Sequence, residues 1–345
     1  MLVVMYKDAS EEQIERVLEI SEELGYTAIP NPGARRMVIN ITGEVDLSNI
    51  SRLEGLVGVM KVIPVSKPYR LADVEVKSEP TVIEVGDVEI GGKKPVIIAG
   101  PCSVETHDIL VETAIAVKDC GCDILRGGAF KPRTSPYSFQ GLGVEGLKIL
   151  EAARERTGLP VISEAVDTDS FSAVEAAVDI VQIGARNMQN YSLLKRAGRS
   201  HRPILLKRGI SASLGELLSA AEYIMAEGNS NVILCERGIR TQCNHTRFTL
   251  DLSSIPVLRN MTHLPLFVDP SHAAGKRDIV IPLARAGLAI GSDGLIIEAH
   301  PRPDEAFVDG SQSLTIDMLQ EFMDSCRTSG YWRNGYEIKL GASSE

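Results

Sequence analysis

Eight short apolar runs, spaced by roughly 20–35 residues, constrain the fold of this chain most, because each spacing has room for a strand, a helix and two loops. Nearly continuous apolar strands are typical of a parallel sheet that is buried on both faces. Eight such units predict a (β/α)8 barrel, that is, an α/β TIM barrel, over residues 81–330. A doubly wound open sheet is the alternative, and the lack of a G-x-G-x-x-G after the first run disfavours it. The runs are VIIAG at 96, ILRGGAF at 124, VISEAV at 161, IVQIGA at 180, ILLKRG at 204, VILCERG at 232, LFVDPSH at 266 and LIIEAH at 295.

The first 65 residues have a different order of strand-like and helical segments, which predicts a small separate domain. LVVMYK is strand-like, and SEEQIERVLEISEELG predicts a helix. Ser10 and Gln13 fit a capping box at its start, and Gly25 ends the helix. TAIPNP and RRMVINITG predict a strand pair that turns around Pro32-Gly33, DLSNISRLEGLVGVM a second helix, and KVIPV a fourth strand. The order βαββαβ is that of a ferredoxin-like domain.

Prolines and scattered charges predict a linker at residues 66–80, which joins the two domains. TVIEVGDVEIGG, directly before the first barrel strand, predicts a short hairpin. Residues 331–345 are expected to form a C-terminal tail.

Composition narrows the function. A net charge of −10 disfavours general binding to nucleic acid or to an anionic membrane, and no apolar run approaches the length of a membrane span. Six cysteines in 345 residues make no disulfide framework, so we expect a cytoplasmic protein. If such an acidic protein handles anionic substrates, it must use local clusters of basic residues.

Two sets of side chains follow the predicted strands, at the end of a barrel where chemistry takes place. The first is cationic and suits a polyanionic ligand, because buried guanidinium and ammonium groups need partners. The second combines a thiol, an imidazole and two carboxylates, which can bind a divalent transition metal. Taken singly, each residue also has a plain structural explanation: a core cysteine, a hydrogen-bonded histidine or an ordinary ion pair. The cations are Arg126, Lys131, Arg133, Arg186, Lys207 and Arg237, and the second set is Cys102, His272, Glu298 and Asp309.

The motifs around these residues resemble those of 3-deoxy-D-arabino-heptulosonate-7-phosphate (DAHP) synthases, in the subfamily related to 3-deoxy-octulosonate-8-phosphate (KDO8P) synthases. The resemblance covers about residues 81–327, and the N-terminal unit resembles the regulatory extension of some members. The motifs are IAGPCSVET, LRGGAFKPRTSPYSFQGLG, VQIGARNMQN, PILLKRG, CERGIRT, VDPSHAAGKR and IIEAHPRPDEAFVDGSQSL.

The resemblance implies a transferase that condenses phosphoenolpyruvate with erythrose 4-phosphate and water, giving DAHP and phosphate, as the first step of the shikimate pathway towards aromatic amino acids. Lys131 is the expected proton donor to the aldehyde oxygen or the group that orients it, and either Glu164 or a metal-bound water is expected to activate the attacking water. The implied metal ligands are Cys102, His272, Glu298 and Asp309. The implied phosphoenolpyruvate site is Arg126, Lys131, Ala185, Arg186, Lys207 and Arg237, and the implied erythrose 4-phosphate site is Arg133, Thr134 and Ser135.

Several points stay open at this level. Manganese, iron and zinc all suit the ligand set. A KDO8P synthase that uses arabinose 5-phosphate is the nearest alternative, and a non-catalytic amino-acid sensor is an alternative of another class. We expect allosteric regulation by tyrosine or phenylalanine through residues 1–65, and a homo-oligomer, with a tetramer as the working assumption. Cys120-Gly121-Cys122 is expected to serve packing, and the 239–248 loop, with Cys243 and His245, to cover the site.

Overall fold

The computed structural model describes residues 1–32, 37–42, 46–64, 67–132, 135 and 137–329. The chain forms two compact units, Met1–Arg70 and Leu71–Glu345. The turn expected at Gly33 and the expected C-terminal tail lie outside the described residues.

The first unit is the expected βαββαβ domain. Its antiparallel sheet has the order β2-β3-β1-β4 among the described residues. Val3, Met5, Val17 and Ile39 pack in a core between this sheet and the helices. Ser10 and Gln13 form the predicted capping box at the start of α1. The elements are β1 (Leu2–Met5), α1 (Glu11–Glu23), β2 (Thr27–Pro32), β3 (Met37–Thr42), a 3-10 turn (Leu47–Asn49), α2 (Ile50–Glu54) and β4 (Val59–Ile63).

The second helix of this unit is shorter than its sequence pattern predicted. It ends at Glu54, and the last two residues of the predicted helix, Val59 and Met60, belong to strand β4 instead. Val59 is buried and pairs with Met5 of β1. Pairing with the sheet therefore decides the start of β4, which the local apolar pattern placed two residues later.

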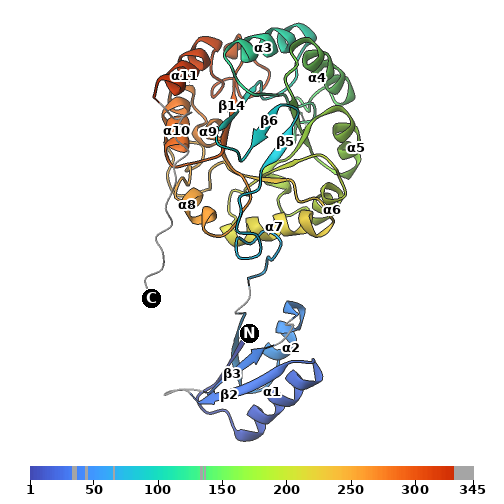
Figure 1. Ribbon diagram of the computed structural model, residues 1–345, viewed down its shortest axis with the longest axis vertical. Helices are drawn as coiled ribbons and strands as arrows, with labels where there is room; N and C mark the ends of the chain where they lie inside the picture. The colour runs from blue at the N-terminus through green and yellow to red at the C-terminus, as the bar shows by residue number, and fades with distance from the viewer. Residues whose placement is uncertain (33–36, 43–45, 65–66, 133–134, 136, 330–345) are drawn as a thin grey trace. The chain divides into compact units, whose positions relative to one another are not determined.

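The second unit confirms the predicted α/β barrel. Its eight described strands are parallel and form a closed barrel in the order β10-β11-β12-β13-β14-β7-β8-β9. Figure 1 shows the helices as a ring around these strands. The strands are β7 (Val96–Gly100), β8 (Ile124–Arg126), β9 (Val161–Ala165), β10 (Ile180–Ile183), β11 (Ile204–Lys207), β12 (Val232–Glu236), β13 (Leu266–Val268) and β14 (Gly294–Glu298).

Most of the surrounding helices have the local signals that start and position a helix. Asp167 and Ser213 form capping boxes at α5 and α7, and Thr106 caps α3. Two short helical turns, η2 (Ala185–Asn187) and η3 (Pro303–Glu305), lie in loops that follow strands. The helices are α3 (His107–Asp119), α4 (Val144–Thr157), α5 (Thr168–Ala177), α6 (Tyr191–Gly198), α7 (Leu214–Ala226), α8 (Ser254–Arg259), α9 (Pro270–Ala274), α10 (Arg277–Ala289) and α11 (Ile316–Ser329).

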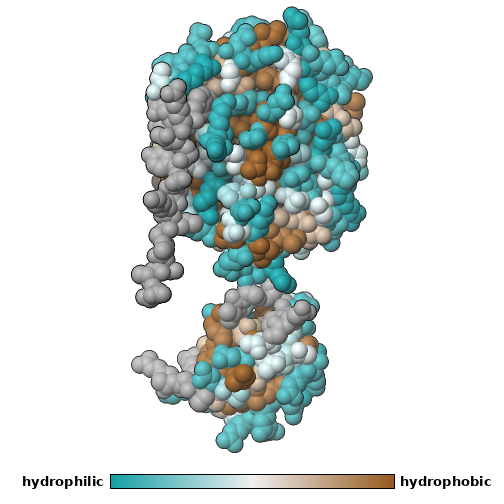
Figure 2. Space-filling model, in the orientation of Figure 1, coloured by the Kyte–Doolittle hydropathy of each residue, from teal (hydrophilic) through white to brown (hydrophobic). Residues whose placement is uncertain are grey.

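The predicted hairpin closes the N-terminal end of the barrel. It consists of β5 (Ile83–Val85) and β6 (Val88–Ile90), and it lies across the barrel axis in Figure 1. Ile83 and Ile90 pack with Val96 and other residues from the barrel strands. On the face shown in Figure 2, hydrophilic residues cover much of the ring of helices, and hydrophobic residues gather towards the centre, over the hairpin. One end of the barrel is therefore plugged, and any chemistry belongs at the other.

The segment predicted as a linker is partly fixed to the barrel. The backbone N–H groups of Leu71 and Ala72 donate hydrogen bonds to the Glu222 carboxylate on α7. Asp73 forms a β-bridge with Thr262. In the part of the chain that the structure describes, no helix combines the length and the apolar character that crossing a membrane requires.

Candidate active site

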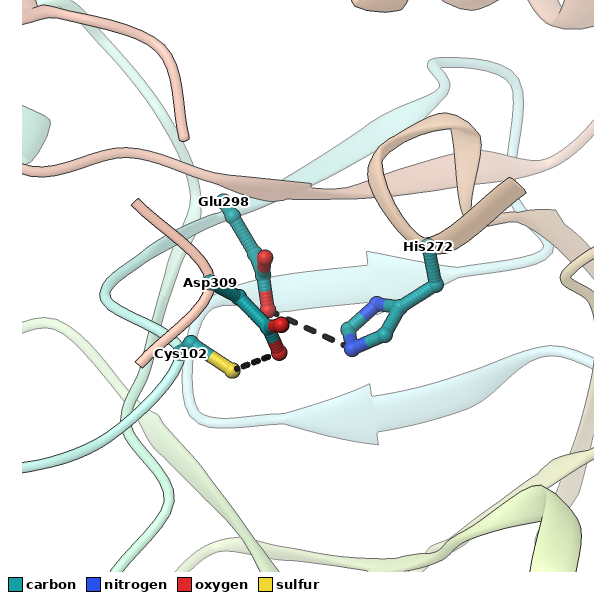
Figure 3. A group of neighbouring side chains, drawn as sticks. All are labelled: Cys102, His272, Glu298 and Asp309. Carbon is teal, nitrogen blue, oxygen red and sulfur yellow. Dashed lines mark hydrogen bonds and ion pairs between the residues drawn. The ribbon is translucent and has the colours of Figure 1, made fainter. Parts of the chain in front are cut away.

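The four candidate metal ligands come together at the C-terminal end of the barrel. Cys102 follows β7, Glu298 ends β14, His272 lies on α9 and Asp309 lies in the loop after β14. Strands β7 and β14 are neighbours, and Gly100 pairs with Glu298. One potential ligand atom from each side chain lies within 4.8 Å of all the others. Figure 3 shows the four side chains pointing towards one another.

The chemistry of this cluster fits a metal ion. The Cys102 thiol donates to Asp309 Oδ2 at 3.1 Å, and His272 Nε2 lies 3.3 Å from Glu298 Oε1. Glu298 Oε1 is buried and accepts no hydrogen bond of good geometry from the described residues. A buried carboxylate oxygen without a donor is costly, and a divalent cation at this point would satisfy it.

The protonation states also suit metal binding. Burial lowers the pKa of His272, which favours loss of the ring proton and a free lone pair on Nε2. Burial alone would raise the pKa of Glu298, but His272 and Arg126 outweigh it, and the pKa is lowered. Burial, and then the charge of Glu298, raise the pKa of Cys102 well above its usual value. The thiol therefore needs a metal ion to become a thiolate near neutral pH.

Asp269 connects the metal cluster to one of the cations. It is fully buried, and its Oδ2 lies 2.5 Å from Lys207 Nζ and 2.7 Å from His272 Nδ1. Its Oδ1 accepts from the backbone N–H of His272 and so caps α9. Burial would raise the pKa of Asp269, but His272 and Lys207 hold it well below the usual range. An ionised Asp269 beside Nδ1 fixes the tautomer that leaves Nε2 free for a metal.

Two of the predicted cations contact the cluster. Arg126 Nη2 lies 3.2 Å from Glu298 Oε1, and Lys131 Nζ donates to Cys102 Sγ at 3.2 Å. Arg237 is buried, yet its Nε and Nη1 have no hydrogen-bond partner among the described residues, and neither does Nη1 of Arg126. Unpaired buried guanidinium donors are what a bound anion would satisfy.

The other predicted residues of the phosphoenolpyruvate site lie in the loop after β10 and on β9. Ala185 and Arg186 form the helical turn η2, and the Arg186 side chain is exposed. Glu164 is buried and its Oε2 accepts from Gln182 Nε2 at 3.1 Å. Gly184 leaves room for this carboxylate, because a Cβ there would lie only 2.0 Å from Glu164 Oε1.

The predicted aldose site is only partly described. Arg133 and Thr134 lie outside the described residues. Ser135 is partly buried, and its carbonyl accepts from Gln140 Nε2. The backbone N–H of Lys131 donates to the Gln140 carbonyl, so the two sides of this loop are connected next to the metal cluster.

The residues that the sequence analysis set aside lie elsewhere or play other parts. Cys243 and His245 are exposed in the loop after β12, and Cys120 and Cys122 are buried. Arg208, which follows Lys207 and was not assigned to the site, forms a buried ion pair with Glu236.

The sequence analysis did not assign three polar residues whose side chains contact the candidate metal ligands or their neighbours: Asp269, Gln312 and Arg247. Asp269 and Gln312 belong to the DPSH and DGSQSL motifs that carried the resemblance, so their type and place were visible. Arg247, in the TQCNHTR stretch, was seen only as part of a covering loop. No local pattern could reveal that all three lie beside the metal cluster.

Comparison with known proteins agrees with this geometry. Residues 72–329 match the DAHP synthetase I family, and residues 1–67 match the DAHP synthase ferredoxin-like domain. The chain is 46% identical over 327 residues to phospho-2-dehydro-3-deoxyheptonate aldolase of Thermotoga maritima, which covers 95% of this chain and 97% of that protein. It is 33% identical over 261 residues to 2-dehydro-3-deoxyphosphooctonate aldolase of Syntrophotalea carbinolica, with 70% of this chain and 93% of that protein covered.

Solved structures show the same likeness. The crystal structure of the Thermotoga maritima DAHP synthase superposes with a TM-score of 0.92 at 46% identity and covers 95% of this chain and 96% of that chain. A truncated form of DAHP synthase from Thermotoga maritima superposes with a TM-score of 0.72 at 45% identity and covers 76% of this chain and 97% of that chain. The protein is therefore a member of the DAHP synthetase I family that also has the DAHP synthase ferredoxin-like domain.

Proposed function

We propose that this protein is a DAHP synthase, a transferase (EC 2.5.1.54) that condenses phosphoenolpyruvate with erythrose 4-phosphate and water to give DAHP and phosphate. The observation that carries the proposal is the meeting of a metal-binding cluster with buried cations at the open end of the barrel. Arg126 belongs to the cations and contacts the cluster, since its Nη2 lies 3.2 Å from Glu298 Oε1. The 46% identity to the Thermotoga aldolase over 95% of the chain supports the same reaction.

Phosphoenolpyruvate would bind among the cations. It carries about three negative charges near neutral pH, and it needs several Arg and Lys donors to neutralise and orient it. The unpaired donors of Arg126 and Arg237 are buried and ready for such an anion. The Arg237 guanidinium lies 4.4 Å from the centre of the Phe248 ring, which holds it in place. Lys207, Arg186 and the Ala185 backbone complete the proposed site.

Cys102, His272, Glu298 and Asp309 would hold a divalent ion, for which manganese, iron and zinc are candidates. When bound, the ion supplies Lewis-acid polarisation of the aldehyde of erythrose 4-phosphate. Arg133, Thr134 and Ser135 would bind the phosphate of that aldose.

Lys131 would supply the proton that the carbonyl oxygen needs. Burial would lower the pKa of Lys131, but the negative charges of a Cys102 thiolate, Glu164 and Glu298 outweigh it and raise the pKa, which favours the ammonium form. In the reaction, C3 of phosphoenolpyruvate forms the new bond to the aldehyde carbon, and the aldehyde oxygen takes a proton from Lys131. Water then adds at C2, the C2–O bond to the phosphate breaks, and inorganic phosphate leaves. Glu164, held by Gln182, would accept the proton from this water.

Metal removal tests the proposal. EDTA treatment should abolish consumption of phosphoenolpyruvate, and a divalent ion should restore it. Cys102→Ala should lower the rate by orders of magnitude without unfolding the barrel, while Cys122→Ala, at another buried cysteine, should leave the rate close to that of the unmodified protein. Full activity of the metal-free protein would contradict the metal site.

The choice of aldose distinguishes the nearest alternative. A KDO8P synthase would use arabinose 5-phosphate, and two relatives of that kind match this chain at 33% and 31% identity. We expect turnover with erythrose 4-phosphate and little with arabinose 5-phosphate in parallel coupled assays. Turnover with neither aldose, by a folded and metal-loaded protein, would favour a non-catalytic sensor.

The unit Met1–Arg70 would act as a regulatory domain that binds tyrosine or phenylalanine. The barrel unit, Leu71–Glu345, contains all the candidate catalytic residues and has its own core. A chain that starts at Leu71 should keep synthase activity and lose inhibition by these amino acids. If the full chain ignores both, the effector assignment fails, and the domain more simply supports assembly of a homo-oligomer. We place the enzyme in the cytoplasm.

A further inference from the structure

Gln312 lies against the metal cluster without belonging to it. Its side chain is almost fully buried, 1% exposed, in the loop that follows β14. Nε2 donates to Glu298 Oε2 at 2.6 Å, and Oε1 accepts from Arg247 Nη1 at 3.2 Å. The two neighbours fix the amide orientation, because an ionised carboxylate only accepts hydrogen bonds and a guanidinium only donates them.

Arg247 reaches the cluster from a different loop, the one after β12. Its Nη1 lies 3.4 Å from Asp309 Oδ1, so the same atom contacts a metal-ligand candidate and Gln312. Its backbone N–H donates to Ala274 of α9, the helix that carries His272. Gly275 ends that helix with φ of 67°, and a Cβ there would lie 2.6 Å from the Arg247 Cβ. Arg247 is thus fixed against α9 by close backbone packing.

The contacts of Gln312 and Arg247 are made to Glu298 and Asp309, the two carboxylates of the metal cluster. Glu298 and Asp309 are two carboxylates that converge on one point and repel each other. Asp309 lies on a loop, and its φ of 54° is the only positive value at a non-glycine residue in the described part of the chain. Such a backbone conformation persists where the surrounding contacts hold it in place.

We propose that Gln312 and Arg247 are positioning residues of the metal site. Gln312 fixes the rotation of the Glu298 carboxylate by its hydrogen bond to Oε2, which leaves Oε1 directed at the cluster. Arg247 offsets the charge of Asp309 and orients the Gln312 amide. The inference rests on the metal site of the proposed function, and it assigns to these two residues an effect on metal affinity and geometry.

The test is a titration of the metal-free full chain with cobalt(II), whose visible bands report coordination geometry and whose thiolate charge-transfer band reports Cys102. Gln312→Met keeps the size of the side chain and removes the donor. It should weaken cobalt binding by about 10- to 100-fold and change the visible bands at saturation. The melting temperature of the metal-free protein should stay close to that of the unmodified protein. Gln320→Met is the control away from the metal cluster, because the Gln320 amide also donates to a carboxylate, that of Asp324 on α11, but at an exposed position.

Two further variants separate the possible failures. Cys102→Ala must abolish the charge-transfer band; if it does not, the metal site itself is wrong. If Cys102→Ala behaves as expected and Gln312→Met binds cobalt with unchanged affinity and bands, the positioning role is refuted. Should Gln312→Met fail to fold, Arg247→Met decides, because its side chain is 38% exposed and its loss is tolerable. Weaker cobalt binding by Arg247→Met supports the proposal, and unchanged binding overturns it.

Discussion

Replacing Asp269 by Asn should separate the two tasks that this buried carboxylate performs. The amide keeps the shape and can still accept from the His272 backbone at the start of α9. It loses the negative charge that faces Lys207 Nζ at 2.5 Å and His272 Nδ1 at 2.7 Å. Lys207 is 4% exposed, so its ammonium would stay buried without its ion-pair partner.

The magnitude follows from that burial. Removing one partner of a buried ion pair typically costs about 3–5 kcal/mol, because the other charge is left uncompensated. For a domain of this size, about 2 °C of melting temperature is lost per kcal/mol, so we expect a decrease of about 6–10 °C in the metal-free protein. Loss of the carboxylate behind His272 should weaken metal binding by about 10- to 100-fold.

Phosphoenolpyruvate gives the experiment a second arm. An anion bound beside Lys207 would replace part of the missing negative charge, so it should raise the melting temperature of Asp269→Asn more than that of the unmodified protein. Thermal unfolding with and without phosphoenolpyruvate, and competition for metal with a chromophoric chelator, measure both effects.

Asp293→Asn is the matched control. Asp293 forms a partly buried ion pair with Arg259 at 2.8 Å and accepts from the Leu266 backbone, before strand β14 and away from the metal cluster. It should lower the melting temperature and leave metal affinity unchanged. The reasoning is refuted if Asp269→Asn binds metal as tightly as the unmodified protein, or if the two variants lose metal affinity equally.

Two further predictions concern the substrates and the thiol. Arg133→Ala, at a residue outside the described part of the chain, should raise KM for erythrose 4-phosphate far more than KM for phosphoenolpyruvate, and Arg186→Ala should do the reverse. Steady-state kinetics with each substrate varied in turn measure both constants. Equal effects of both variants on both constants would contradict this division. Metal affinity should increase with pH around neutrality, by up to about tenfold per pH unit for the proton that Cys102 must lose, because burial raises the pKa of this thiol and protons compete with the metal. Chelator competition at several pH values checks this, and a pH-independent affinity would show that Cys102 is not a ligand.

Much of the fold could be predicted from local sequence. The eight apolar runs became the eight barrel strands because nearly continuous apolar residues suit a sheet that is buried on both faces. The box formed by Ser10 and Gln13 starts α1 where the pattern placed it, since capping depends only on residues within one turn. The predicted boundary was wrong where pairing with another strand competes with a local pattern, as at Val59, which belongs to β4 rather than to the preceding helix.

The candidate site was visible in the sequence as residue types at strand ends and as motifs that resemble one family. Only the tertiary structure brings Cys102 within hydrogen-bond distance of Asp309, which is 207 residues away, because the barrel closes β14 against β7. The contacts of Asp269, Gln312 and Arg247 likewise depend on loops that follow different strands. The sequence by itself determined which elements form and which chemical groups follow them, since these depend on neighbouring residues. Barrel closure and loop packing decided which groups meet, because contacts between distant residues are set by how the strands are ordered in space.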